Sequence, residues 1–459
     1  MTSRNRIAVI DIGKTNAKVA LVDLGNFREV AVRRTPNRPK SGPPYPHHDH
    51  ENLKAFILES LAALGRDFAV DAISVTAHGA TMALLDGDGD LALPILDYEY
   101  EGPDTLADEY DALRPTFAET GSPRLPGGLN AGAQLFWQMR TFPEAFGRVR
   151  AIVTYPQYWS GWLSGVTASE VTSLGAHTDL WNFGARRFSS LVERMGWLDL
   201  MAPLRQATER LGLLREDISR KVGLERPVPV YCGIHDSNAS LYPHLAARKP
   251  PFSVVTTGTW VITMAIGGPP TALDPDRDTL VNIDFAGNAV SSARFMGGRE
   301  FERLCPDDRS DPGEAELARV LEPKIMLLPS VQAGTGPFPH SVSRWIGDPE
   351  RLTVSERRAA VSTYLAMMTA TCLSLIGARG PTVVEGPFAG NRIFRRILAA
   401  ATARPLICAE EGTTGTSFGA ALLTDPHALH TLPAEAVTEP ATDRRIAAYI
   451  AAWQAACVE

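Results

Sequence analysis

Eight consecutive residues near the start of the chain carry the groups that phosphate chemistry requires. They read Asp11-Ile12-Gly13-Lys14-Thr15-Asn16-Ala17-Lys18. The glycine lets backbone N–H groups approach phosphate oxygens, Thr and Asn add donors, and the lysines add positive charge. The aspartate is a carboxylate of the kind that lies near Mg²⁺. The pattern predicts a polyphosphate site that uses Gly13, Lys14, Thr15, Asn16 and Lys18. An ordinary surface hairpin is the alternative.

Gly13-Lys14-Thr15 also invites comparison with a P-loop. That motif requires a glycine five residues before the glycine of Gly-Lys, and this sequence has Ala8 there. A P-loop also leads into a helix, whereas this turn leads into an apolar, strand-like segment. The P-loop interpretation is therefore rejected.

A second polar turn, Thr256-Thr257-Gly258-Thr259, lies between two apolar runs. Small hydroxyl residues and a glycine in a tight turn can surround phosphate oxygens. Taken alone, an ordinary Thr-rich hairpin is the better interpretation. Its pairing with the first turn favours a functional role, since two such hairpins facing each other would hold one polyphosphate from both sides.

Asp236 is the candidate catalytic base. It follows a predicted strand at 228–232 and opens a predicted helix at 236–245. An aspartate at this position is most often a helix N-cap. However, α/β proteins place their chemistry at the carboxyl ends of strands, and phosphoryl transfer to a hydroxyl needs a carboxylate to orient the alcohol. Asp236 could do this beside His235, which would hydrogen-bond the same substrate.

The elements that position these residues alternate between strand and helix. Each polar turn sits in a predicted hairpin, 7–22 and 252–265, and each hairpin opens one half of the chain. Further helices are predicted at 51–64, 130–139, 158–161, 354–376, 391–402 and 416–423, further strands at 72–76, 382–385 and 406–408, a third hairpin at 81–95, and a surface loop at 38–50. This order predicts an α/β protein with an internally duplicated architecture.

Length, charge and composition exclude some classes of protein. A length of 459 residues favours two domains, and a net charge of −7 with a pI near 5.9 argues against a nucleic-acid partner. Five scattered cysteines without a CxxC pair fit reduced thiols. The first apolar run is short and ends at an aspartate, and no window has about 18 apolar residues. We expect a cytoplasmic protein without a membrane partner.

In their order along the chain, these segments resemble the FGGY family of carbohydrate kinases, from residue 7 to about residue 423. Besides the two turns, the similar motifs are Thr76-Ala77-His78-Gly79, the segment 158–165 followed by Glu170-Val171-Thr172, the segment 233–239 with its aspartate, and the segments 385–391 and 413–420. Each motif alone is weak, whereas the ordered set is specific.

The resemblance implies a ribonuclease-H-like (actin-like ATPase) fold in each of two domains, 1–240 and 241–459, with the active site in a central cleft. It implies ATP and Mg²⁺ as cofactors and a sugar as substrate. The implied roles are Asp11 and Asp236 near Mg²⁺; Gly13, Thr15, Thr257, Gly258 and Thr259 around phosphates; His78, Gly79, His235 and Asp236 facing the sugar; and Gly386, Gly390 and Asn391 flanking adenosine.

Within the family, Thr257-Gly258-Thr259-Trp260 and the His235-Asp236 pair look most similar to kinases of 6-deoxy-ketohexoses such as rhamnulose and fuculose. Tyr98 and Glu99 would help to select the sugar, while xylulose, ribulose or a polyol stay open. Lys14 stands where many members have Thr and would add a contact to the γ-phosphate. Lys18 stands where members often have Arg, and the loop 329–337 lacks a frequent Glu-Arg pair.

Three alternatives to a sugar kinase would each require other sequence features. An actin-like ATPase without sugar-kinase activity would need no sugar pocket, and His78 and His235 argue against it. A sugar-responsive regulator would need a DNA-binding module before the strand at Ile7. A dehydrogenase would need a Gly-x-Gly-x-x-Gly turn.

The tract His47-His48-Asp49-His50 favours a solvated loop over a metal site. A homodimer is one expected assembly.

Overall fold

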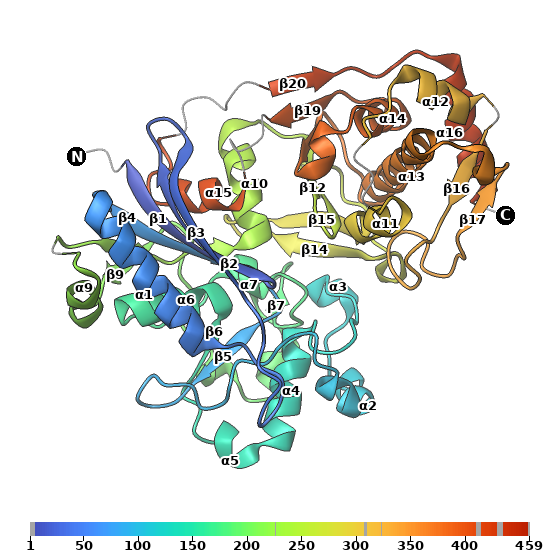
Figure 1. Cartoon of the computed structure of the whole chain (residues 1–459). Coiled ribbons are helices and arrows are strands. Elements are labelled where there is room, and N and C mark those ends of the chain that lie inside the picture. The colour runs from blue at the N-terminus through green and yellow to red at the C-terminus, as the bar shows by residue number, and fades with distance from the viewer. Residues whose placement is uncertain are drawn as a thin grey trace. The chain divides into compact units, whose positions relative to one another are not determined.

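The computed structural model describes residues 5–224, 226–306, 310–322, 324–409, 415–428 and 435–457. The chain divides into two compact units, Met1–Ala247 with Val281–Ala289 and Gly412–Leu432, and Arg248–Leu280 with Val290–Glu411 and Pro433–Glu459. The structure has two large mixed sheets with helices packed on them, which confirms the predicted α/β class (Figure 1). None of the five cysteines, all of which lie among the described residues, forms a disulfide. Among the described residues, no helix is both long and apolar enough to span a bilayer.

The sheet of the first unit has the strand order β3-β2-β1-β4-β10-β9, with β11 also paired to β4. Its strands are β1 (Arg6–Ile12), β2 (Asn16–Asp23), β3 (Arg28–Pro36), β4 (Ala72–Ala77), β9 (Arg210–Leu213), β10 (Pro229–Tyr231) and β11 (Ile234–His235). β1, β4 and β11 run parallel, with Ile12 opposite Ala77 and Ala77 opposite His235. The carboxyl ends of these three strands therefore meet at one edge of the sheet.

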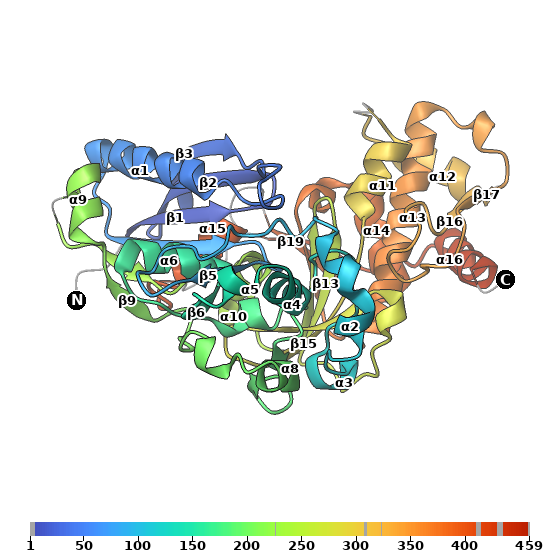
Figure 2. The same ribbon diagram turned by 90° about the horizontal axis from the view of Figure 1, so that it is seen from below.

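Helices cover both faces of this sheet because β1 is apolar at the consecutive positions Ile7–Ile10, whose side chains point alternately to the two faces. Ala8 and Ile10 of β1 pack toward α1 (His50–Asp67), α6 (Tyr155–Ser164) and α9 (Glu216–Val222). Ile7 and Val9 pack on the other face, toward α10 (Asp236–Ala247) and α15 (Thr416–Leu422). Figure 2 shows α1 running along β2 and β3. The side chains of β1 are therefore buried on both faces of the sheet.

The prediction of a hairpin at 81–95 is wrong for its second strand, residues 91–95. β5 (Met82–Leu85) pairs with the distant β6 (Ala151–Thr154), and the 91–95 segment contributes only an isolated bridge between Leu85 and Leu91. The Asp86 carboxylate accepts the N–H groups of Asp88 and Asp90, which forms the predicted turn. Pro94 has no N–H group to extend a ladder.

The first unit also contains shorter helices and strands, which lie between β5 and β9 along the chain. They are α2 (Ala107–Asp111), α3 (Phe117–Thr120), α4 (Ala131–Thr141), α5 (Pro143–Phe146), α7 (Val171–Leu174), α8 (Ser190–Arg194), β7 (Trp181–Asn182) and β8 (Arg187–Phe188). Helices were predicted at 130–139 and 158–161, and the structure confirms both as α4 and α6.

The second large sheet has the order β14-β15-β13-β12-β18-β19-β20. Its strands are β12 (Phe252–Thr257), β13 (Val261–Ile266), β14 (Thr279–Ile283), β15 (Ala289–Phe295), β18 (Thr382–Glu385), β19 (Leu406–Ala409) and β20 (Glu435–Thr438). The other elements of the second unit are α11 (Gly297–Leu304), α12 (Glu314–Leu321), α13 (Val354–Leu375), α14 (Arg392–Thr402), α16 (Arg444–Ala456), β16 (Met326–Leu328) and β17 (Arg344–Ile346). A capping box of Thr353 and Glu356 begins α13, whose long apolar face packs with α14 in the core.

Candidate active site

Two carboxylates lie close together at the edge where the parallel strands end. Asp11 is near the end of β1, and Asp236 opens α10 directly after β11. Burial, followed by the negative charge of Asp236, raises the pKa of Asp11 to about 6, against the opposing effect of Lys18. Lys18 pairs across the hairpin, with Nζ 3.7 Å from Asp11 Oδ2 and 3.1 Å from Glu29 Oε1. This repulsion between carboxylates is what a divalent cation would relieve.

The first polar turn is the tight hairpin that the sequence predicts. The Gly13 N–H group donates to the Asn16 carbonyl at 3.0 Å, and a Cβ at Gly13 would lie 2.9 Å from that oxygen. The turn leads into β2 and not into a helix, in agreement with the rejection of a P-loop. The roles of Thr15, Asn16 and Lys18 toward phosphate stay predictions.

His78 follows β4 and presents one acceptor nitrogen. Its Nδ1 lies 2.9 Å from the Gly79 carbonyl, which only accepts, so Nδ1 carries the proton. Burial lowers the pKa of His78 to about 4, so the ring is neutral at pH 7. Its buried Nε2 has no hydrogen-bond partner among the described residues. A neutral histidine with a free acceptor suits a substrate hydroxyl.

His235 and Asp236 form a contact pair at the start of α10. His235 Nε2 lies 3.2 Å from Asp236 Oδ1, and the Ser237 N–H group donates to the same oxygen at 2.6 Å. The Asp236 side chain is 31% exposed, so the carboxylate can reach a ligand. Gly233 allows this turn, because its φ is +83° and a Cβ there would lie 2.2 Å from the Val75 carbonyl.

Gly79 leaves room for His235, and this gives a testable prediction. A Cβ at Gly79 would lie 2.8 Å from His235 Nε2 and 3.6 Å from Ala176 Cβ. We expect Gly79→Ala to displace the His235 ring while the protein stays folded. For the sugar that the family resemblance implies as substrate, KM should rise and kcat should fall, and kcat/KM should decrease by about 10-fold. Steady-state kinetics with a thermal melt would measure this. Gly87→Ala is the matched control, since a Cβ at Gly87 meets nothing within 4 Å. Equal kinetics of the two variants would contradict the prediction.

The buried carboxyl group of Glu170 is linked to His235 through Thr172. The His235 N–H group donates to Thr172 Oγ1 at 3.1 Å, and both the Thr172 hydroxyl and its N–H group, the latter at 3.0 Å, donate to Glu170. Burial raises the pKa of Glu170 to about 7. The segment Glu170-Val171-Thr172 therefore holds the histidine that contacts Asp236.

Glu170 should make the stability of the protein depend on pH. A carboxyl group with a raised folded pKa binds more protons in the folded than in the unfolded chain between its two pKa values. Its contribution therefore falls as pH rises from about 4.5 to about 7. We expect Glu170→Gln to gain up to about 3 kcal/mol relative to wild type between pH 5 and pH 8. Urea unfolding at both pH values measures this, and a pH-independent difference would refute it.

The predicted sugar-selecting residues lie beside His78. The Tyr98 ring packs edge-on against the His78 ring with centroids 5.3 Å apart. Lys14 lies over Tyr98, with Nζ 4.5 Å from the ring centroid, and is ion-paired to Asp97. Glu99 Oε2 lies 3.4 Å from Lys14 Nζ. Asp97 was not predicted from the sequence, although a carboxylate that follows the apolar run 91–96 was a signal.

His48 corrects the interpretation of the His-rich tract as a solvated loop. It is 1% exposed, and its ring packs against those of His78 and Tyr155, with centroids 5.1 and 5.2 Å away. Burial lowers the pKa of His48. The described residues contain no cluster of three or more metal-ligating side chains. The His48 ring is tilted by 36° against His78 and by 32° against Tyr155, and these partners are distant in the sequence.

The second unit has a pocket of about 480 Å³ beside the second polar turn. A Cβ at Gly386 would lie 2.0 Å from the Thr257 carbonyl. Asn391 caps α14 by accepting the Phe394 N–H group at 3.0 Å. The pocket also has an aromatic wall, in which the rings of Phe301 and Phe388 are 5.5 Å apart. The lining includes Thr257, Gly258, Thr259, Gly390 and Asn391. Of the predicted segment 413–420, residues 413 and 414 lie outside the described residues.

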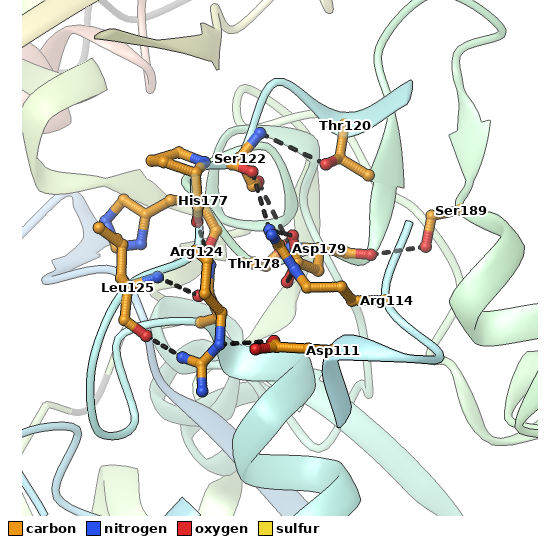
Figure 3. Close-up of polar contacts among 12 residues, drawn as sticks. Asp111, Arg114, Thr120, Ser122, Arg124, Leu125, His177, Thr178, Asp179 and Ser189 are labelled. Carbon is orange, nitrogen blue, oxygen red and sulfur yellow. Dashed lines mark hydrogen bonds and ion pairs between the residues drawn. The ribbon is translucent and has the colours of Figure 1, made fainter. Parts of the chain in front are cut away.

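A buried polar network holds the loop that carries Ala176 (Figure 3). Asp179, which is 0% exposed, accepts both Arg114 Nε at 3.2 Å and Arg114 Nη2 at 2.9 Å, and also the Tyr110 hydroxyl at 2.7 Å. Arg114 also donates to the Ser122 carbonyl at 2.9 Å. Asp179 has a φ of +65° and His177 a φ of +48°, so side-chain contacts fix a backbone that non-glycine residues rarely adopt.

Comparison with known proteins identifies the family of this chain. Residues 6–242 match the N-terminal domain of the FGGY family of carbohydrate kinases, and residues 249–432 match an FGGY carbohydrate kinase C-terminal domain. The crystal structure of a carbohydrate kinase from Novosphingobium aromaticivorans is 37% identical, has a TM-score of 0.91 and covers 99% of each chain. A xylulose kinase from Lactobacillus acidophilus shares the fold at 15% identity, with a TM-score of 0.81 over 99% of this chain and 97% of the other.

L-fuculokinases are among the more distant relatives. That of Salmonella typhi is 24% identical over 57% of this chain, and that of Escherichia coli K12 is 25% identical over 56%. The chain spans only 57% and 56% of the lengths of these two relatives.

Proposed function

Because the chain belongs to the FGGY family of carbohydrate kinases, we propose that it transfers the γ-phosphoryl group of ATP to a primary hydroxyl of a sugar. The observation that carries the proposal is the group of His78, His235 and Asp236 at one sheet edge, close to Asp11. It combines an accessible carboxylate with a free acceptor nitrogen. Such a group can orient an alcohol and take its proton.

In the proposed step, the sugar hydroxyl gives its proton to Asp236 as its oxygen bonds to the γ-phosphorus. The bond from that phosphorus to the leaving oxygen of ADP breaks in line. The neutral His78 ring would accept a hydrogen bond from the sugar, and His235 would donate one to Asp236, which keeps the carboxylate oriented. The chain's residues thus position the alcohol and hold the proton.

Asp11 and Asp236 would hold a Mg²⁺ ion, which would supply positive charge beside the phosphates. Mg²⁺ is commonly bound through one or two carboxylates and substrate phosphates, so a cluster of three protein ligands is not required. When bound, it would neutralise charge on the transferring group. The raised pKa of Asp11 beside Asp236 supports this placement, because the ion would offset their repulsion.

The nucleotide base is proposed to occupy the pocket of the second unit. Phe301 and Phe388 offer ring faces and edges to adenine, and the Arg358 guanidinium lies 4.9 Å from the Phe301 ring centroid. Thr257, Gly258 and Thr259 line the same pocket and would contact phosphates. Gly390 and Asn391 would then form part of the wall of the adenosine site. Gly386 would lie beside it, packed against the Thr257 carbonyl.

The proposed substrate class is a 6-deoxy-ketohexose such as L-fuculose or L-rhamnulose. The support is the similarity to L-fuculokinases and the Tyr98 and His78 rings, which offer an apolar edge beside an acceptor nitrogen. A pentulose such as xylulose or ribulose, or a polyol, is the alternative within the family.

The test is ADP release from purified protein with Mg·ATP and, in turn, L-fuculose, L-rhamnulose, xylulose, ribulose, aldoses and glycerol. We expect a 6-deoxy-ketohexose to give the highest kcat/KM, with product detected by mass spectrometry. Preference for a pentulose or polyol would overturn the substrate class alone. ADP release at one rate with and without every sugar would overturn the kinase function and favour an ATPase.

A further inference from the structure

Lys14 belongs to the first polar turn, but its side chain leaves the turn. Its ammonium group is ion-paired to Asp97 and lies 3.4 Å from Glu99 Oε2 and 4.5 Å from the Tyr98 ring centroid. The Lys14 side chain is only 16% exposed. An ammonium held by a carboxylate and a ring face is fixed in place, because each partner offsets part of its lost hydration.

Asp97 is the rigid partner in this contact. Its side chain is 8% exposed, and its Oδ1 also accepts the Glu99 N–H group at 3.1 Å. Its backbone N–H group donates to the Pro46 carbonyl at 3.0 Å, and its carbonyl accepts the Tyr100 N–H group at 2.9 Å. A carboxylate this buried needs a cation, and Lys14 supplies it.

The turn 97–99 reaches the proposed sugar site through one ring. Tyr98 packs edge-on against His78 at 5.3 Å, and the Tyr98 carbonyl accepts the Gly128 N–H group at 3.0 Å. Continuous contacts therefore run from Lys14 through Asp97 and Tyr98 to His78. Each member of this series belongs to the first unit.

We infer that Lys14 is a positioning residue for sugar recognition, and that it acts through Asp97 and Tyr98 and not as a ligand of the γ-phosphate. The lysine holds the Tyr98 ring against His78, so that the ring forms one wall of the sugar site. This inference rests on the proposed function, since it takes His78 and Tyr98 as the residues that contact the sugar.

The experiment separates sugar binding from nucleotide binding. Lys14→Met, Asp97→Asn and the double variant are titrated calorimetrically, without nucleotide, with the sugar that wild type phosphorylates best. KM for ATP is then measured at saturating sugar. We expect each single variant to weaken sugar binding by about 10-fold, and the double variant to be no weaker than either, because both changes break the same contact. KM for ATP should change less than about twofold.

Control variants distinguish a positioning role of Lys14 from binding of phosphate. Lys14→Arg keeps the cation and should retain sugar affinity near wild type, while Lys221→Met removes an exposed lysine of α9 and should change nothing. Unchanged sugar affinity in Lys14→Met, or a raised KM for ATP with normal sugar binding, would overturn the inference and make Lys14 a phosphate ligand. If wild type phosphorylates no sugar, the proposed function fails instead. Thermal melts of all variants separate these results from unfolding.

Discussion

Replacing Asp236 with asparagine is expected to lower kcat by about 10²- to 10⁴-fold, the range for removal of a general base. Asparagine has nearly the same shape, and its oxygen can still accept the Ser237 N–H group that now donates to Oδ1 at 2.6 Å. The His235 Nε2 contact at 3.2 Å can also persist. Binding of sugar and ATP should therefore change little, and the loss should appear in the chemical step.

Rapid-quench measurement of a single turnover would test this, with sugar affinity measured separately by calorimetry. The competing interpretation is that Asp236 only caps a helix. Asp443 gives a matched control, since it caps α16 by accepting the Arg445 N–H group at 2.9 Å. Asp443→Asn should cost about 1 kcal/mol of stability or less and leave kcat unchanged. If Asp236→Asn behaves in the same way, Asp236 is a cap and the assignment of the base fails.

The residues at the ends of β1, β4 and β11 were predictable because local patterns determine them. Each follows an apolar strand, and parallel strands of one sheet bring their carboxyl ends to a common edge. Asp11, His78 and Asp236 thus converge without any knowledge of the loops between them. The two hairpins were also predictable, since each places a glycine turn between two apolar runs.

Contacts between distant segments could not be predicted in this way. β5 and β6 are separated by 65 residues between Leu85 and Ala151, and nothing in either strand specifies the other. The burial of His48 depends on Tyr155, more than one hundred positions away along the chain. The direction of the Lys14 side chain depends on Asp97 in the same manner. Sequence patterns give the faces and ends of elements, whereas partner choice requires the folded chain.

The pairing of Arg114 with Asp179 leads to the largest expected effect on stability. Asp179 is fully buried, and its carboxylate accepts two guanidinium donors of Arg114 (Figure 3). It also accepts the Tyr110 hydroxyl. Asp179→Ala would leave the Arg114 charge largely buried without its carboxylate, since that side chain is only 15% exposed. Loss of one partner of a buried pair costs about 3–5 kcal/mol. We expect a loss of this size in the free energy of unfolding by urea.

Asp111→Ala is the matched control within the same network. Asp111 binds Arg124 at 2.8 Å, but the Asp111 side chain is 47% exposed and Arg124 also pairs with Asp104. Loss of an exposed pair costs about 1 kcal/mol or less, because water replaces the partner. The double variant Arg114→Met with Asp179→Leu should recover much of the stability, since no buried charge stays unpaired. Equal losses in Asp179→Ala and Asp111→Ala would mean that the burial of Asp179 does not govern the cost, and that the positive φ at this residue is held by other contacts of the loop.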